Sequence, residues 1–327
     1  MEKVAAMVDF ESFRPLLEEL TAREVKGPGG RPRFDPVMMF KILLLQQWNN
    51  LADAKTEFLV NDRLSFQRFL GLSLGDPVPD ATTIWLFREH LGHDGCERLF
   101  AAFGRALDAE GMITRAGSIV DATFVEAPRQ HNSAGENLAI KRGQVPDGWD
   151  DPAVTRPAKR RQKDANARWA VKRSRAHYGY KNHVKIDADS KLIIAHRVTH
   201  AAVHDSRMLA ELVDGQDQVV WADSGYSGQQ MQALVTAAHP GVELRISRRA
   251  SRNRALTSQD EENNRAVSRV RCRVEHVFGH IKKAMGGSVV TQIGLVRAKT
   301  RCVLRDLAYN IHRAGIIAPA TRITASP

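Results

Sequence analysis

The stretch that decides the fold reads Ser118-Ile119-Val120-Asp121-Ala122-Thr123-Phe124-Val125, in a chain of 327 residues. It follows Gly117, and it is a short apolar run rich in the β-branched residues that favour strands. Asp121 lies inside this run, where an unpaired carboxylate is costly unless a cation or hydrogen bonds meet it. The stretch therefore predicts a mostly buried strand that carries one acid.

The residues that follow predict a mixed sheet. Two more strands are expected at Tyr180–Ile186 and Leu192–Val198, separated by the turn Asp187–Ser190. Helices and strands then alternate: a helix from Asp205 to about Val213, the strand Gln218–Asp223, a helix from about Gln229 to Ala238 and the strand Val242–Ser247. Three consecutive strands followed by this alternation predict an α/β fold in which helices flank a mixed sheet.

The last third of the chain predicts helices. Six apolar residues recur at helical spacing and predict a long amphipathic helix from Arg265 to about Met285: Val267, Val270, Val274, Val277, Phe278 and Ile281. We expect Arg248–Asn264, which is polar, to be loosely structured. We expect a final helix from about Val296 to His312 to cover the sheet.

The N-terminal region predicts short helices joined by Gly and Pro turns. They are expected at Asp35 to about Asn61, at Asp62–Leu70, from Asp80 or Thr82 onwards, and from about Gly95 to Glu110. Such an all-helical region is typical either of a helix-turn-helix DNA reader or of a small bundle used for dimerisation, and the sequence favours neither.

The charge is distributed unevenly along the chain. The net charge of +11 is the sum of −3 for residues 1–115, with 14 Lys/Arg and 17 Asp/Glu, and +14 for residues 116–327, with 34 and 20. An excess of this kind is typical of a protein that neutralises nucleic-acid phosphates. A basic but inert solvated face is the alternative.

Composition excludes several classes of protein. A hydrophobic share of 43% with 26% charged residues is that of a soluble globular chain rather than a disordered one. Cys96, Cys272 and Cys302 are far apart, so neither a disulfide framework nor a thiolate zinc site is expected. No apolar run approaches the roughly 18 residues of a membrane span, and the first residues are unlike a signal peptide. We expect a cytoplasmic, nucleoid-associated protein that does not bind a membrane.

Two acids are expected to meet at one edge of the sheet. Asp223 closes the apolar strand Gln218–Asp223, just as Asp121 is embedded in its own strand. Taken singly, each acid is more typical of a turn or a cap. Together they can converge and supply the carboxylate oxygens that Mg²⁺ prefers.

The long helix offers a third acid. Arg271, Glu275, Phe278 and Lys282 lie on one stripe of Arg265–Met285. This stripe is explained either by a surface ion pair worth a few tenths of a kcal/mol or by a functional site. In the functional alternative, Glu275 completes a metal site while Arg271 and Lys282 hold phosphates, and the three acids bind two metal ions for displacement at phosphorus.

These motifs resemble those of the DDE transposases of bacterial insertion sequences. The resemblance rests on Asp121, on Asp223 within Ala222-Asp223-Ser224-Gly225-Tyr226, and on Arg271, Glu275 and Lys282, which match that family's Y-x2-R-x3-E-x6-K signature. Three further stretches are also similar to the family: Arg168-Trp169, Tyr178-Gly179-Tyr180-Lys181-Asn182-His183, and Val203-His204-Asp205-Ser206. The chain departs from the signature at Ser268, where the family has tyrosine.

The resemblance implies an RNase-H-like catalytic domain at residues 116–316 with a basic insertion at about 127–176. The helical region 1–115 would then bind the transposon end or dimerise, and residues 317–327 would form a tail. Asp121, Asp223 and Glu275 would be the catalytic residues and the ligands of two Mg²⁺ ions, for which Mn²⁺ substitutes. Water would attack a phosphodiester at each transposon end, and the freed 3′ hydroxyl would attack target DNA.

The implied partner is double-stranded DNA, bound by a homodimer or larger assembly. Arg271 and Lys282 would position the end DNA, and the basic segments would contact its backbone. The predicted contacts in these segments are Lys159, Arg160, Arg161, Lys163, Arg168, Trp169, Lys172, Arg173, Lys181, Arg248 and Arg249. The alternatives are a DNA-binding regulator without catalysis and a nuclease without strand transfer.

Three histidines and two further aspartates are not expected to bind a metal ion. His196, His200 and His204 would share a face only on a helix, whereas Leu192–Val198 predicts a strand, so we reject a zinc site there. Asp187 and Asp205 are explained by a turn and by a helix N-cap.

Overall fold

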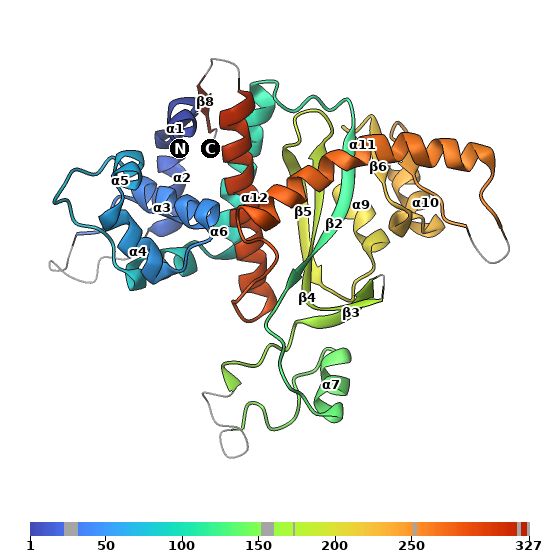
Figure 1. Cartoon of the computed structure of the whole chain (residues 1–327), viewed down its shortest axis with the longest axis horizontal. Helices are drawn as coiled ribbons and strands as arrows, with labels where there is room; N and C mark the ends of the chain where they lie inside the picture. The colour runs from blue at the N-terminus through green and yellow to red at the C-terminus, as the bar shows by residue number, and fades with distance from the viewer. Residues whose placement is uncertain (23–31, 152–159, 173, 251–253, 319–321, 326–327) are drawn as a thin grey trace.

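The computed structural model describes residues 1–22, 32–151, 160–172, 174–250, 254–318 and 322–325. A mixed sheet forms one half of the molecule and a helical region the other, as Figure 1 shows. The sheet strands are β2 (Ser118–Glu126), β3 (Arg168–Lys172), β4 (Arg175–Asp187), β5 (Ile193–His200), β6 (Val219–Ala222) and β7 (Glu243–Ile246). Every strand that the sequence predicted is present, and β3 was not predicted.

The strand order is that of the RNase-H-like fold. β4 pairs antiparallel with both β2 and β5, whereas β2, β6 and β7 run parallel to one another. β2 therefore lies between β4 and β6 in the middle of the sheet. The short β3 pairs with the first residues of β4 and extends the sheet toward the insertion.

Helices cover both faces of β2. Ile119 packs into the core shared with α11 (Ser258–Lys283) and α12 (Leu295–Ile317), whereas Val120 packs against α9 (Leu209–Leu212) and α10 (Gln229–Ala238). Both side chains are completely buried. This burial on two faces explains why the stretch 118–125 is apolar almost throughout.

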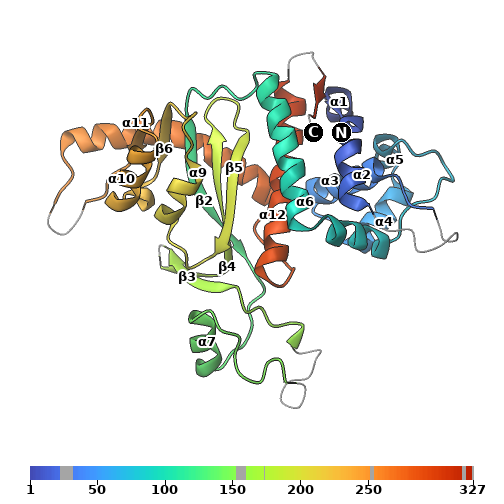
Figure 2. The same ribbon diagram turned by 180° about the vertical axis from the view of Figure 1, so that it is seen from behind.

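The N-terminal region is helical and shares its core with the half that contains the sheet. Its helices are α1 (Glu2–Met7), η1 (Phe10–Phe13), α2 (Arg14–Thr21), α3 (Pro36–Asn49), α4 (Asp53–Asp62), α5 (Leu64–Leu70) and α6 (Ala81–Ala109). Figures 1 and 2 show α12 between these helices and the sheet. Trp48 donates its indole N–H to the Ala308 carbonyl (2.8 Å), which ties α3 to α12.

Three predicted boundaries differ from the structure. The helix predicted at 35–61 is divided because Asn50 adopts a left-handed conformation and ends α3. The two helices predicted after Asp80 form the single element α6, kinked at Gly92, where φ is +60°. α11 begins at Ser258, so residues 258–264 are helical rather than loose, and a capping box between Thr257 and Asp260 starts the helix.

The two ends of the described chain form a small sheet. β1 (Val8–Asp9) pairs in parallel with β8 (Ile323–Thr324), so the N-terminal region is not purely helical. The expected tail at 317–327 therefore contains a strand that packs on the N-terminal region.

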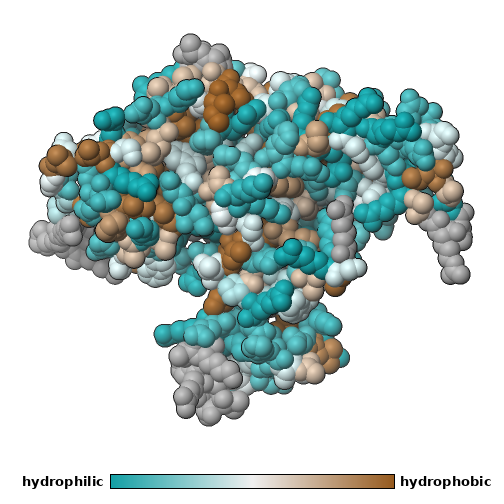
Figure 3. All heavy atoms as spheres, viewed as in Figure 1, coloured by the Kyte–Doolittle hydropathy of each residue, from teal (hydrophilic) through white to brown (hydrophobic). Residues whose placement is uncertain are grey.

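The insertion projects from the sheet below β3, with the helix α7 (Ala134–Lys141) at its end (Figure 1). Asp164 anchors it to the rest of the molecule: its carboxylate accepts hydrogen bonds from the Tyr180 hydroxyl (2.6 Å) and the Gly294 N–H (3.1 Å). In Figure 3, hydrophilic residues cover most of the described part of the insertion that faces the viewer. No helix among the described residues has the length and apolar character that crossing a membrane requires.

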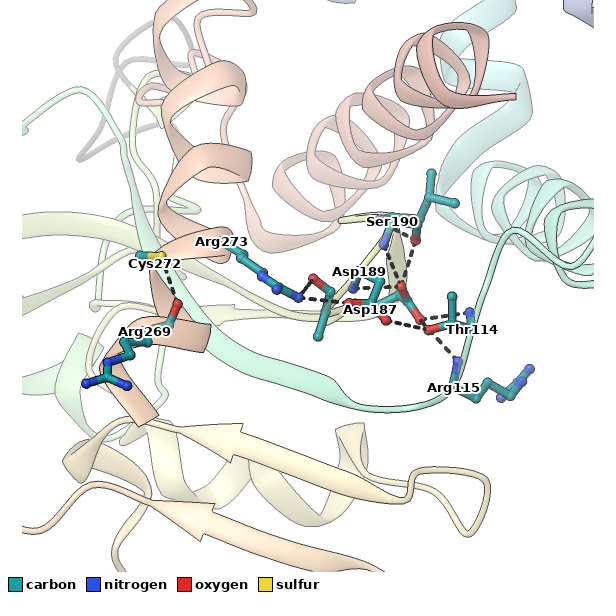
Figure 4. Close-up of polar contacts among 10 residues, drawn as sticks. Thr114, Arg115, Asp187, Asp189, Ser190, Arg269, Cys272 and Arg273 are labelled. Atoms are coloured by element: carbon teal, nitrogen blue, oxygen red, sulfur yellow. Dashed lines mark hydrogen bonds and ion pairs between the residues drawn. The ribbon is translucent and has the colours of Figure 1, made fainter. Parts of the chain in front are cut away.

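Asp187 joins the two halves of the molecule at the turn between β4 and β5. Its carboxylate accepts from the Ser190 N–H (2.7 Å) within the turn and from the Thr114 N–H (2.9 Å) in the link to the N-terminal region. Arg273 of α11 donates to the Ala188 carbonyl (2.7 Å) in the same turn. Figure 4 shows these contacts converging on the turn, which confirms a turn role for Asp187.

We expect Asp187→Ala to lower the free energy of unfolding by about 3 kcal/mol, because a completely buried carboxylate that accepts several hydrogen bonds is removed. Asp189→Ala is the matched control, since that side chain lies in the same turn but is 56% exposed, and its expected loss is below about 1 kcal/mol. Urea denaturation measures both. Equal losses would contradict the assignment of Asp187 as the link.

Candidate active site

Asp121 and Asp223 lie next to each other on neighbouring parallel strands. Val120 is opposite Ala222 in the β2–β6 pair, and the two aspartates are the residues that directly follow. β6 ends at Ala222, whereas β2 continues to Glu126. The two carboxylates are therefore held at the point where the sheet stops on one side, as expected for a site at the carboxyl end of a strand.

Asp121 is a nearly buried carboxylate with two fixed contacts. Its side chain is 11% exposed, the Ala122 N–H donates to Oδ1 (2.7 Å), and Arg271 of α11 donates to Oδ2 (2.7 Å). Burial raises the pKa of Asp121, the nearby guanidinium of Arg271 lowers it, and the charge of Asp223 raises it again. The two acids thus interact electrostatically, and Arg271 offsets part of their repulsion.

A tight turn fixes Asp223. Its Oδ1 accepts from the Gly225 N–H (2.7 Å) and caps the turn η3 (Ser224–Tyr226). A Cβ at Gly225 would lie 2.8 Å from that oxygen, so a side chain there would displace the Asp223 carboxylate. Tyr226 follows, completely buried, and its hydroxyl has no hydrogen-bond partner among the described residues. Burial raises the pKa of Tyr226 well above its usual value, and Asp121, Asp205 and Asp223 raise it further.

Glu275 is not brought to the two aspartates. It lies one helical turn after Arg271 on α11, is exposed, and has no polar partner among the described residues. The buried side of α11 instead carries Val274 and Val277, and Arg271 is the residue that reaches Asp121. Within the described ranges, no three His, Cys, Asp or Glu side chains are placed to hold a metal ion.

The aspartate pair alone fits a hard divalent cation. Mg²⁺ is commonly bound by one or two carboxylates together with waters and substrate phosphates. Asp121 and Asp223 supply such carboxylates from rigid strands, although Arg271 holds one oxygen of Asp121 in this structure. The complete three-acid set remains a prediction.

Positive charge gathers beside the end of β2. Lys282 of α11 is half-buried, and burial lowers its pKa, with a further lowering from Lys172 and a raising effect from Glu126. Arg175 also lies near Glu126 (3.7 Å between Nη2 and Oε1). Lys282, predicted to contact DNA, is near enough to Asp121 for that carboxylate to raise its pKa as well, and Lys172, also a predicted contact, lies near Lys282.

Two predicted DNA contacts have structural roles instead. Lys163 is buried and donates to the His131 carbonyl (2.6 Å) and to Asn132 Oδ1 (2.7 Å). Lys181 is also buried and pairs with Asp205 (2.7 Å). Since both ammonium groups are committed to internal acceptors, we assign these lysines to the structure rather than to DNA.

The other predicted contacts vary in exposure. Arg161 and Arg249 are exposed, and Trp169 is 45% exposed with Arg129 over its ring. Arg160 pairs with Asp150, Arg248 pairs with Asp260, and Arg168 donates to the Ala165 and Ala167 carbonyls. Lys159 and Arg173 lie outside the described residues.

Asp205 does not cap the helix that follows it. The N-cap of its short helix η2 (Asp205–Met208) is His204, so the predicted capping role of Asp205 is wrong. Asp205 pairs with Lys181 of β4, and its Oδ2 lies 3.8 Å from the position of a Cβ on Gly225, beside the Asp223 turn. The similarity of Val203-His204-Asp205-Ser206 to the transposase family was the feature of the sequence that could have indicated a position for Asp205 near the site.

Comparisons with known proteins give matches over both halves of the chain. Residues 1–90 match the family model described as Transposase domain (DUF772), and residues 114–311 match the one described as Transposase DDE domain. A solved structure described as "Cryo-EM structure of piggyBac transposase synaptic complex with hairpin DNA (SNHP)" is also similar. It has 11% sequence identity and a TM-score of 0.45, over 99% of this chain and 75% of that one.

Replacing Lys181 with Met is expected to lower the free energy of unfolding by about 3 kcal/mol, because Asp205, whose side chain is only 13% exposed, is left without its ion-pair partner. The matched control is Arg197→Met, since Arg197 forms an exposed pair with Glu211, and its expected loss is below about 1 kcal/mol. Chemical denaturation compares the two. A Lys181→Met protein as stable as the control would show that the Lys181–Asp205 pair is not structural.

Proposed function

The chain belongs to the family of transposase DDE domains, whose model matches residues 114–311, and on this premise we propose that it cuts and joins DNA at the ends of a transposable element. It is a transposase, an enzyme of the polynucleotidyl transferase type, and its partner is DNA. The observation that supports the proposed chemistry is the pair of adjacent carboxylates, Asp121 and Asp223, flanked by cations of α11.

The proposed reaction is two displacements at phosphorus. In the first, a water oxygen forms a bond to the phosphorus at a transposon end, and the bond to the 3′ oxygen breaks. In the second, the freed 3′ hydroxyl attacks a target phosphodiester, so that one P–O bond is exchanged for another without a covalent protein intermediate. When bound, two Mg²⁺ ions, or Mn²⁺ in their place, would activate the attacking oxygen and stabilise the leaving oxygen.

The residues of the chain have distinct parts in this reaction. Asp121 and Asp223 would hold the cations from the ends of their strands, and Glu275 would be the third ligand. Arg271 and Lys282 would bind the phosphates on either side of the bond that is cut, since guanidinium and ammonium groups pair well with phosphate oxygens. The exposed predicted contacts, Arg161, Trp169 and Arg249 among them, would bind DNA further along.

The assembly proposed for the reaction is at least a homodimer. Two transposon ends must be cut and joined in a coordinated way, which requires two active sites. The helical region 1–115 is proposed either to read the transposon end or to form this dimer.

Asp121→Asn and Asp223→Asn are expected to reduce Mg²⁺-dependent nicking of a DNA that contains a transposon end by more than about 100-fold. Loss of a residue that only supports a metal ligand costs up to about 100-fold, and loss of the ligand itself should cost more. Glu275→Gln is expected to do the same if it is the third ligand. Asp189→Asn, an exposed acid in the turn after β4, is the control and is expected to retain activity. Cleavage on a denaturing gel measures all four.

The same assay separates the alternatives. Full activity of the aspartate variants would refute the site. Nicking without joining of the cut end to a second DNA would identify a nuclease, and binding without metal-dependent nicking would identify a regulator.

Salt dependence should report the DNA-contacting cations. The logarithm of the DNA-binding constant falls linearly with the logarithm of the salt concentration. Arg249→Gln and Lys282→Gln are each expected to reduce the magnitude of this slope by about 0.9, the value for one phosphate contact. Arg197→Gln, an exposed arginine paired with Glu211, is the charge-matched control and should leave the slope unchanged. Fluorescence anisotropy over a salt series measures the slopes, and equal slopes in all three variants would contradict the assigned contacts.

A further inference from the structure

The ion pair between Asp121 and Arg271 occupies the position where the proposed chemistry needs a free carboxylate. The Asp121 side chain is 11% exposed and that of Arg271 is 18% exposed, so water screens the pair weakly. One oxygen of Asp121 accepts from the Ala122 N–H and the other from Arg271. A cation could bind Asp121 fully only after Arg271 has released it.

Arg271 is incompletely satisfied in this pair. Its Nε is buried and has no hydrogen-bond partner among the described residues. A guanidinium presents five N–H donors in a planar fork, and a phosphate offers several acceptor oxygens to such a fork. A DNA phosphate at the site would therefore be a better partner for Arg271 than the single oxygen of Asp121.

The helix that carries Arg271 is anchored by other contacts. Arg273 donates to the Ala188 carbonyl (2.7 Å) and to Asp189 (2.9 Å), as Figure 4 shows. Val267, Val274 and Val277 are completely buried in the core. Arg271 can therefore change partner by a side-chain rotation while α11 stays in place.

We propose that Arg271 couples metal binding to DNA binding: in the DNA-free protein it holds Asp121 and excludes a divalent cation, and a DNA phosphate draws it away and opens the site. The proposal rests on the proposed function, because it concerns the same two aspartates. It agrees with the finding that no three acids within the described ranges are placed to hold a metal ion, since a guanidinium contacts Asp121 where a cation would bind.

Thermodynamic linkage makes the proposal quantitative. A ligand that removes Arg271 from Asp121 must raise the affinity for the cation, and the cation must raise the affinity for that ligand by the same factor. Couplings of this kind are typically about 5- to 150-fold. The arrangement would confine metal loading to protein that is already bound to DNA.

The test measures Mn²⁺ binding to the full chain by electron paramagnetic resonance, at about pH 8, where carboxylates are ionised. In the absence of DNA, Arg271→Gln is expected to bind Mn²⁺ about tenfold tighter than the wild type. A short DNA duplex is expected to tighten Mn²⁺ binding to the wild type by a similar factor and to have little effect on Arg271→Gln.

The control is Arg265→Gln, which removes one positive charge from an exposed side chain of the same helix that pairs with Glu261, and its Mn²⁺ affinity should equal that of the wild type. Equal Mn²⁺ affinities of wild type and Arg271→Gln in the absence of DNA would overturn the proposal. If Arg271→Gln does not fold, Arg271→Lys replaces it. This variant is expected to bind Mn²⁺ several-fold tighter than the wild type in the absence of DNA, and an unchanged Mn²⁺ affinity would overturn the proposal.

The Asp223→Asn variant distinguishes failure of the Arg271 coupling from failure of the proposed function. If Mn²⁺ binding depends on Asp223 but not on Arg271 or DNA, only the coupling is refuted. If Mn²⁺ binding is the same with and without Asp223, and the wild type does not nick DNA, the proposed function fails as well.

Discussion

The desolvation of Asp121 is the constraint on which the rest of the site depends. A carboxylate in the middle strand of a sheet, covered by helices on both faces, must be compensated by a cation or by hydrogen bonds. In this structure Arg271 and the Ala122 N–H provide that compensation. The register of β2 against β6 places Asp223 beside Asp121, and the charge of Asp223 opposes ionisation of Asp121, so the contact with α11 offsets both burial and this repulsion.

The helical region and the sheet are not independent bodies in this chain. α12 contributes to one core with α3 and α6 on one side and β5 on the other, and Asp187 ties the link before β2 to the turn after β4. Arg273 of α11 donates to the Ala188 carbonyl in the same turn. The N-terminal region and the helix that carries Arg271 therefore contact one common turn.

Hydrophobic pattern predicted the central elements well, because β2, β6 and α10 are buried on the faces that their sequences indicate. β3 was missed because none of its side chains is buried and it lies in a long polar interval, and the start of α11 was missed because its first turns are polar. The site was predicted only in part. A list of charges cannot show that Lys181 is buried against Asp205 or that Arg271, rather than Glu275, reaches Asp121, since both depend on tertiary packing.

The pairing of β1 with β8 has a consequence for the synthesis of the protein. The strand partner of Val8, Ile323, and the helix α12, which packs against α1, are synthesised roughly 300 residues later than Val8. The hydrophobic faces of the N-terminal helices are therefore fully covered only after α12 has been synthesised. A product cut short before α12 would leave those faces exposed, and such a fragment would be a substrate for chaperones and proteases rather than a smaller working enzyme.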